Sequence, residues 1–241
     1  RLPSEYSFLH RLTGRMRIQN GDQPFELELL PDADGKAALE LYRIRSFRYW
    51  SFKRDNDKVL VTANDGKAGK TMELYNNVPA EYGVFRTDSP DGKAVRLKLR
   101  FINDCWGGIS SGTPFRISSE RWFAARAGIA VPVGFYLRAP ANGRLRITWR
   151  WLRERNTNAG ESLGILLETP EGKRLVSDVF TIPFEYQEDR KICTYSAELT
   201  IPEAYRGKIL KAWISDPKWI EWRLSGLDDP WLADKPGFLE R

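Results

Sequence analysis

The stretch RLRITWRWL, residues 144–152, decides the fold class because apolar and polar residues alternate along it. Successive side chains of a β-strand point to opposite faces, so one face would carry Leu145, Ile147, Trp149 and Trp151. The opposite face would carry Arg146, Thr148 and Arg150. Both tryptophans continue an aliphatic row. The pattern therefore predicts a core strand with a basic, solvated back rather than a strip of aromatic residues that binds a ligand.

Segments of the same kind recur along the chain, and no segment keeps a helical apolar period over the length of a helix. Seven precede residue 102 and seven follow residue 132, at 25–30, 37–44, 47–53, 58–63, 71–75, 82–87, 94–101, 133–140, 144–152, 162–169, 173–182, 191–201, 208–214 and 218–224. About seven strands are enough for one sandwich. We therefore predict an all-β fold of two tandem antiparallel, jelly-roll-like β-sandwich domains, residues 1–115 and 116–241. A single larger sandwich that uses all the strands is the alternative.

The region between the two sets of strands is predicted to be irregular. Residues 103–115 are rich in Gly and Ser and are typical of a loop or linker. Residues 116–132 are expected to hold one short helix, with Ser118 or Ser119 as its N-cap.

Four turns share a motif, DGK at 34–36, 65–67 and 91–93 and EGK at 171–173. Glycine in a positive-φ position after an acidic residue predicts a β-hairpin. None of these turns has the D-x-D-x-D spacing of a calcium loop. We expect no cofactor, although a structural calcium ion is left open.

The composition indicates a folded chain with a modest positive field. The 241 residues are 41% hydrophobic and 12% aromatic, with nine tryptophans and a net charge of +6. Residues 1–115 hold 18 Lys and Arg against 15 Asp and Glu, and residues 116–241 hold 20 against 17. Because the excess is spread evenly, no basic tail of a nucleic-acid-binding protein is present. The field would favour the approach of an anionic ligand.

Cysteine content and hydropathy bear on the compartment in which the protein works. Cys105 and Cys193 could pair, but their separation in sequence favours two free thiols. No apolar run approaches the ~18 residues of a membrane helix, and no signal-peptide pattern opens the chain. The chain begins with Arg1. We expect a piece of a longer secreted or cell-surface protein, whose other domains would be its neighbours, with neither membrane nor nucleic acid as a partner.

Several classes of catalytic site lack their residues. His10 is the only histidine, which excludes a zinc site built from histidine ligands. No G-x-S-x-G accompanies it, and no phosphate-binding glycine loop is present. A pair of catalytic carboxylates depends on spatial separation, which sequence does not show. A jelly-roll polysaccharide lyase would use a basic groove with a Tyr or His base, but the R-x-E-x-R and Q-x-H strands sought for that class are absent.

Aromatic residues outside the predicted core rows are the candidate binding residues. An exposed aromatic ring stacks on the C–H face of a sugar, and charged neighbours bond its hydroxyls. Alternation in 218–224 places Trp219 and Arg223 opposite the core row, and Trp213 lies opposite its own core row with exposure left open. The remaining candidates are in the segment 47–53 and the Gly-rich loop: Arg48, Tyr49, Trp50 and Trp106. A structural role for each is the competing interpretation.

The second half also resembles a β-sandwich module of large multimodular carbohydrate-active proteins from environmental bacteria. The resemblance covers about 110 residues and is carried by GFYLRAP (134–140), LETPEGKRLVSD (167–178), YRGKILKAWI (205–214) and LSGLDDPWLA (224–233). The insertion of Asp228 and Asp229 before Pro230 departs from the module's usual turn. The first half is more distantly similar to the sandwich that precedes such modules. The resemblance implies a sandwich fold and an ancillary, often sugar-binding, role, but it transfers no binding residue.

Taken together, the sequence favours a non-catalytic carbohydrate-binding unit. Its partner would be a polysaccharide or other glycan, and the positive charge favours an acidic one. Two alternatives remain. One is a jelly-roll polysaccharide lyase or glycoside hydrolase, and the other is a structural or protein-interaction sandwich.

Overall fold

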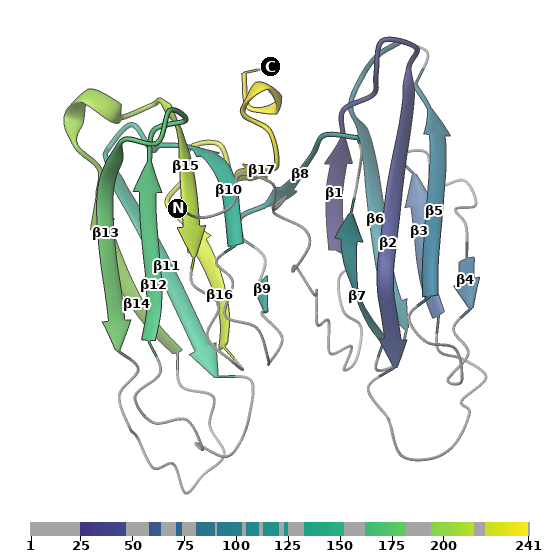
Figure 1. Cartoon of the computed structure of the whole chain (residues 1–241), viewed down its shortest axis with the longest axis horizontal. Helices are drawn as coiled ribbons and strands as arrows, with labels where there is room; N and C mark the ends of the chain where they lie inside the picture. The colour runs from purple at the N-terminus through teal and green to yellow at the C-terminus, as the bar shows by residue number, and fades with distance from the viewer. Residues whose placement is uncertain are drawn as a thin grey trace, which may run out of the picture. The chain divides into compact units, whose positions relative to one another are not determined.

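The computed structural model describes residues 25–46, 58–63, 71–73, 81–89, 91–102, 105–110, 113–120, 123–124, 133–151, 162–181, 194–214 and 220–240. Within these ranges the helical elements are two short 3-10 turns, η2 (Glu203–Tyr205) and η3 (Pro236–Phe238). The strands form antiparallel sheets (Figure 1). The predicted all-β, sandwich-like fold class is therefore confirmed.

The chain divides into two compact units, Leu12–Ile117 and a unit that includes Ser118–Arg241, called here the first and the second unit. The predicted domain boundary after residue 115 stays a prediction. In the first unit, one sheet has the order β8-β1-β6-β3-β4 and the other has the order β5-β2-β7. Their strands are β1 (Phe25–Leu29), β2 (Lys36–Ser46), β3 (Lys58–Ala63), β4 (Thr71–Glu73), β5 (Glu81–Asp88), β6 (Val95–Ile102), β7 (Cys105–Ser110) and β8 (Phe115–Ser118).

The second unit repeats this topology strand for strand. Its larger sheet has the order β17-β10-β15-β12-β13, and its smaller sheet has the order β14-β11-β16-β9. Replacing β1 to β8 by β10 to β17, and leaving out β9, reproduces the order of both sheets. The strands are β9 (Phe123–Ala124), β10 (Val133–Arg138), β11 (Arg144–Trp151), β12 (Ser162–Glu168), β13 (Arg174–Thr181), β14 (Thr194–Thr200), β15 (Ile209–Ile214), β16 (Ile220–Ser225) and β17 (Trp231–Ala233).

The register of the central strands is also the same in both units. In the first unit Leu27 lies opposite Leu97 across β1 and β6. In the second unit Phe135 lies opposite Ala212 across β10 and β15. These four residues are all buried. A one-residue slip would exchange the faces of every side chain, so the shared register gives both units corresponding inward and outward positions.

The core of the second unit is tied together by aromatic rings that reach between its two sheets. Trp149 on β11 stacks on Phe180 of β13 at 5.2 Å between ring centroids. Trp222 on β16 stacks on Phe135 of β10 at 5.7 Å. Leu145, Ile147 and Trp149 are buried, as the alternation in 144–152 predicted. On the opposite face Arg146 is exposed as predicted, but Thr148 is only 6% exposed, so the prediction of a solvated face was wrong for Thr148. The side chains of Arg150 and Trp151 lie outside the described residues.

The glycines of the DGK and EGK turns have the predicted positive φ angles, but not every turn forms the predicted hairpin between paired strands. Gly35, Gly92 and Gly172 have positive φ angles of 73°, 65° and 90°. Only the turn around Gly172 joins neighbouring strands, β12 and β13. The turns around Gly35 and Gly92 instead connect strands of different sheets. The hairpin prediction was therefore wrong for 34–36 and 91–93, because a turn sets local dihedral angles and not the sheet that the next strand joins. The turn at 65–67 lies outside the described residues.

Two predictions for the region between the strand sets were also wrong. Cys105–Ser110, assigned to a loop, is β7 and pairs with β2. In the described part of 116–132 there is a strand end and the short strand β9, not a helix. Ser119 takes part in backbone bonding, since its N–H donates to the carbonyl of Pro230 and its carbonyl accepts from the N–H of Leu224. Sheet pairing thus takes the place of the expected N-cap.

We predict that Trp222→Ala lowers the free energy of unfolding by about 3–5 kcal/mol, because it deletes a fully buried ring from the core. Trp222 is 1% exposed and stacks on Phe135. The control is Val179→Ala, at a side chain that is 69% exposed, and it should change stability by less than about 0.5 kcal/mol. Urea unfolding of both variants measures the difference. Equal effects would contradict the proposed core.

Candidate functional site

The predicted binding residues are only partly within the described structure. Trp219, Arg48, Tyr49 and Trp50 lie outside it. Trp106 belongs to β7 of the first unit, opposite Arg45 of β2, rather than to a free loop. Arg223 belongs to β16 of the second unit, opposite Thr148, and is half-buried.

A different set of residues comes together on the outer face of the larger sheet of the second unit. Across β10, β15 and β12, Tyr136 lies opposite Lys211, which lies opposite Glu168. In the next row on the same face, Gly134 lies opposite Trp213. The intervening residues of these strands point inward and are buried in the core. The outer face thus presents an aromatic ring, a cation and a carboxylate in one cross-strand row.

Trp213 of β15 lies against the sheet beneath the other side chains of this face and contacts both neighbouring strands, β12 and β10. Its Nε1–H donates a hydrogen bond of 2.7 Å to Oε1 of Glu168 on β12. Its ring lies over β10, where a Cβ built on Gly134 would be 2.4 Å from Cζ3 of the indole. Glycine at position 134 is therefore what allows the ring to lie against the strand. Trp213 is only 6% exposed, so it is a supporting ring and not an open platform.

Lys211 connects the two aromatic side chains of the face. Its Nζ lies 4.3 Å from the centroid of the Trp213 ring and 5.9 Å from that of Tyr136. Both distances are within the range of cation–π attraction. Burial raises the pKa of Tyr136, and the nearby carboxylates of Glu168 and Asp234 raise it further. The phenol accordingly stays protonated at neutral pH and can donate a hydrogen bond.

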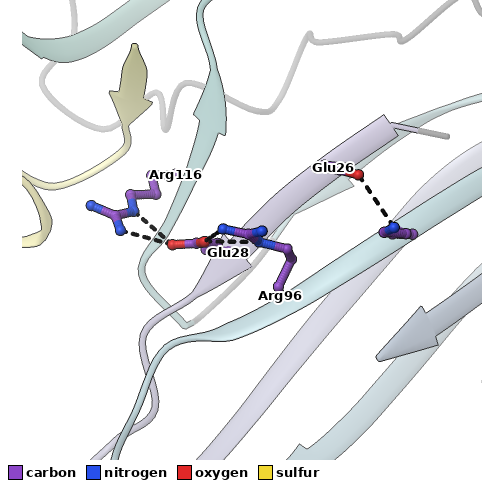
Figure 2. A network of polar contacts seen from close by, with 5 residues as sticks. Glu26, Glu28, Arg96 and Arg116 are labelled. Atoms are coloured by element: carbon purple, nitrogen blue, oxygen red, sulfur yellow. Dashed lines mark hydrogen bonds and ion pairs between the residues drawn. The ribbon is translucent and has the colours of Figure 1, made fainter. Parts of the chain in front are cut away.

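The corresponding outer face of the first unit carries ion pairs instead (Figure 2). Arg96 donates from Nε and Nη2 to Oε1 of Glu28, at 3.1 and 2.8 Å. Arg116 donates from Nε to Oε2 of the same carboxylate at 2.9 Å and places Nη2 2.8 Å from it. Glu28 is 6% exposed although it faces away from the core. Lys98 extends the network with an ion pair to Glu26 at 3.5 Å.

The shared register matches these two faces position by position. Glu28 and Arg96 lie opposite each other across β1 and β6, in the place that Tyr136 and Lys211 take across β10 and β15. In the adjacent row, Glu26 and Lys98 take the place of Gly134 and Trp213. Arg96 thus corresponds to another cation, Lys211. Glu28, Lys98 and Glu26 correspond to Tyr136, Trp213 and Gly134 in that order.

Of the residues on this face, the sequence pattern singled out Trp213 but not Gly134, Tyr136, Lys211 or Glu168, which lie on three strands that are distant in sequence. A signal was present in residues 134–138, where alternation separates Gly134 and Tyr136 from the buried Phe135 and Leu137. An isolated glycine inside a strand pattern marks a close approach of another group. That group is Trp213. Within the described residues, no group of three or more His, Cys, Asp or Glu is placed to hold a metal ion. The described part of the chain also contains no helix long and apolar enough to cross a membrane.

We predict that Glu28→Gln lowers the free energy of unfolding by about 2–4 kcal/mol, because it removes a buried charge from between two arginines. Glu26→Gln is the matched control on the same strand face. It breaks a looser and more exposed pair and should cost less than about 1 kcal/mol. Chemical denaturation of both variants compares them. Similar losses would show that burial of Glu28 contributes little.

We also predict that Gly134→Ala destabilises the second unit by about 1–3 kcal/mol, because the added methyl group overlaps the Trp213 ring. Gly237→Ala is the control, since a Cβ there has no atom within 4 Å. Thermal unfolding measures the loss of stability. Near-ultraviolet circular dichroism reports whether the indole has moved. An unchanged spectrum and an unchanged melting temperature would contradict the contact.

Comparisons with known proteins assign the chain to no family. No protein-family model and no curated protein matches the sequence. Among solved structures, the N-terminal CBM22-1-CBM22-2 tandem domain of Paenibacillus barcinonensis Xyn10C is 9% identical over 92% of this chain and 89% of that chain, with a TM-score of 0.26. Isomalto-dextranase of Arthrobacter globiformis, complexed with panose, is 12% identical over 93% and 36%, with a TM-score of 0.33. The VP2 subviral particle of infectious bursal disease virus is 11% identical over 88% and 55%, with a TM-score of 0.26. At these values, the likenesses establish neither a family nor a function.

Proposed function

We propose that this chain is a non-catalytic carbohydrate-binding protein whose second unit contacts sugar through Tyr136, Lys211 and Glu168. The observation that carries the proposal is the contrast between the two units. At equivalent positions of one shared scaffold, the first unit has ion pairs and the second has aromatic rings with a cation. Either set of outward side chains, ion pairs or aromatic rings, would be enough to stabilise the sheet. The aromatic face therefore supports a role in binding.

The chemistry of the row suits a pyranose ring. The half-buried Tyr136 offers an apolar ring edge and a protonated hydroxyl. Lys211 offers an ammonium donor, and Glu168 offers a carboxylate acceptor, so that hydroxyl groups find partners of both kinds. Trp213 and its bond to Glu168 hold these groups in place from below. Pre-organised polar groups around an apolar surface are characteristic of small-ligand sites.

Local charge favours a neutral sugar at this face, in contrast to the acidic polysaccharide that the net charge of +6 favours. Among the described residues, the carboxylates of Glu168 and Asp234 lie near enough to raise the pKa of Tyr136, and Nζ of Lys211 lies 5.9 Å from its ring centroid. A carboxylate or sulfate group placed beside Tyr136 would meet the like charge of these two carboxylates.

The same geometry argues against a lyase that uses Tyr136 as its base. A tyrosine base must lose its proton before it can take one from the substrate, and its pKa should then lie near the working pH. Burial and two carboxylates move the pKa of Tyr136 upward instead. We therefore assign it the role of a hydrogen-bond donor. We further propose, as part of the same function, that the chain belongs to a larger secreted bacterial protein whose other domains act on the bound polysaccharide.

The test is affinity electrophoresis of the whole chain through gels that contain dextran, xylan or galactan. At least one of these polymers should retard the protein without being shortened. Tyr136→Ala and Lys211→Ala should each weaken that binding by about tenfold, the loss expected for a hydrogen bond to a charged group or a stacked ring. The control is Lys98→Ala, which removes an exposed lysine from the equivalent face of the first unit. It should leave the affinity unchanged.

Three outcomes would overturn the proposal. Shortening of the polymer would make the protein an enzyme. Indifference to every neutral and acidic polysaccharide would favour a structural or protein-interaction sandwich. Equal losses in Lys211→Ala and Lys98→Ala would place the contact elsewhere. Thermal unfolding of each variant shows whether an altered affinity reflects an altered fold.

A further inference from the structure

A second cluster of an aromatic residue and cations lies at one end of the second unit. Tyr205 ends the short turn η2 between β14 and β15, and Lys208 directly precedes β15. Lys173 comes from the turn between β12 and β13. Because β12 and β15 are paired neighbours, these two turns meet at the same end of the larger sheet.

The distances show that these three side chains are organised around the tyrosine. Nζ of Lys173 donates a hydrogen bond of 2.7 Å to the hydroxyl oxygen of Tyr205. It lies 5.3 Å from the centroid of the ring, and Nζ of Lys208 lies 5.6 Å from the same centroid. Lys173 and Lys208 are exposed, whereas Tyr205 is half-buried. Two ammonium groups are thus held beside one phenol, although they repel each other.

The equivalent position in the first unit is neutralised. There Lys93 follows the positive-φ Gly92 and comes just before β6, as Lys208 follows Gly207 before β15. Nζ of Lys93 pairs with Asp91 at 2.9 Å. The hydrogen bond from Lys93 lowers the pKa of Asp91 to about 2, so this pair stays ionised at neutral pH. In the described part of the chain, no carboxylate forms such a pair with Lys173 or Lys208.

We propose that Lys173, Tyr205 and Lys208 form an anion subsite that binds the carboxylate or sulfate group of a substituted polysaccharide. This inference rests on the proposed carbohydrate-binding function and adds the class of glycan that is preferred. The two ammonium groups supply charge-assisted hydrogen bonds to the anion. The Tyr205 hydroxyl, which accepts from Lys173, has its own proton left to donate.

The charges near the cluster leave a positive balance. Arg174 and Arg206 adjoin it in sequence, and the carboxylates on the same two turns are Glu171 and Glu203. A hydrogen bond from Thr169 lowers the pKa of Glu171, which therefore keeps its negative charge, so four cations are set against two carboxylates. Around Tyr136, by contrast, the carboxylates of Glu168 and Asp234 act on the phenol. An anionic group is therefore better accommodated at this end of the sheet than on the sheet face.

The experiment compares three polymers with one backbone: dextran, carboxymethyl dextran and dextran sulfate. Affinities of the whole chain are measured by isothermal titration at low and at moderate salt. We expect at least one of the two anionic polymers to bind more tightly than dextran, with an advantage that shrinks as salt screens the charges. The combined Lys173→Ala and Lys208→Ala variant should lose on the order of tenfold in affinity for that polymer. Comparing carboxymethyl dextran with dextran sulfate identifies which anion is recognised.

Two further variants separate a built site from the general positive field. Tyr205→Phe keeps the ring and removes the hydroxyl, and it should weaken binding of the anionic polymer. Lys93→Ala is the matched control, because it removes one exposed lysine from the equivalent turn of the first unit. Its affinity for the anionic polymer should equal that of the unaltered protein.

The inference is overturned if neither anionic polymer binds more tightly than dextran. It is also overturned if Lys93→Ala loses as much affinity as the altered second unit, since the attraction would then be non-specific. If neither anionic polymer binds but a neutral polysaccharide still does, the anion subsite is contradicted and the proposed function is not. If no neutral or anionic polymer binds, both the subsite and the proposed function are contradicted.

Discussion

The inward rows of the larger sheets constrain the rest of each unit. In both units the central pair of strands, β1 with β6 and β10 with β15, commits alternate side chains to the core in one register. Phe135 stacks on Trp222 of the opposite sheet, and that contact fixes which face of β10 is inside. Once this face is fixed, the side chains between the core residues must point outward. Those outward positions are free to differ between the units.

The two units use this freedom in different ways. The first unit satisfies its outer row internally, because both oxygens of Glu28 are occupied by arginine side chains. Such a closed network is stable only while every partner is present, and it leaves little bonding capacity for a ligand. In the second unit, loss of a side chain at Gly134 makes room for the Trp213 ring, and Glu168 then orients the indole. Gly134 is thus one residue that distinguishes the aromatic outer face of the second unit from the ion-paired outer face of the first.

Alternation predicted the parts of the fold that depend on a two-residue period. It placed Leu145, Ile147 and Trp149 in the core, where they are buried. It missed β7 because Gly107 and Gly108 have low strand propensity and resemble a loop. Pairing with β2 overrides that local preference. The candidate row was missed for a different reason: Tyr136, Lys211 and Glu168 are distant in sequence, and only the pairing of three strands brings them together.

The separation of charges in the second unit links its two candidate regions. The net charge of the chain is +6, but two carboxylates, Glu168 and Asp234, act on Tyr136. Lysines gather instead around Tyr205 at the ends of β12 and β15. A whole-chain charge therefore describes neither region. A polymer with an uncharged ring and an anionic substituent matches this arrangement better than a uniformly charged or a uniformly neutral one. The ring would meet the sheet face, where Glu168 repels anions, and the substituent would meet the turn end, where the lysines attract them.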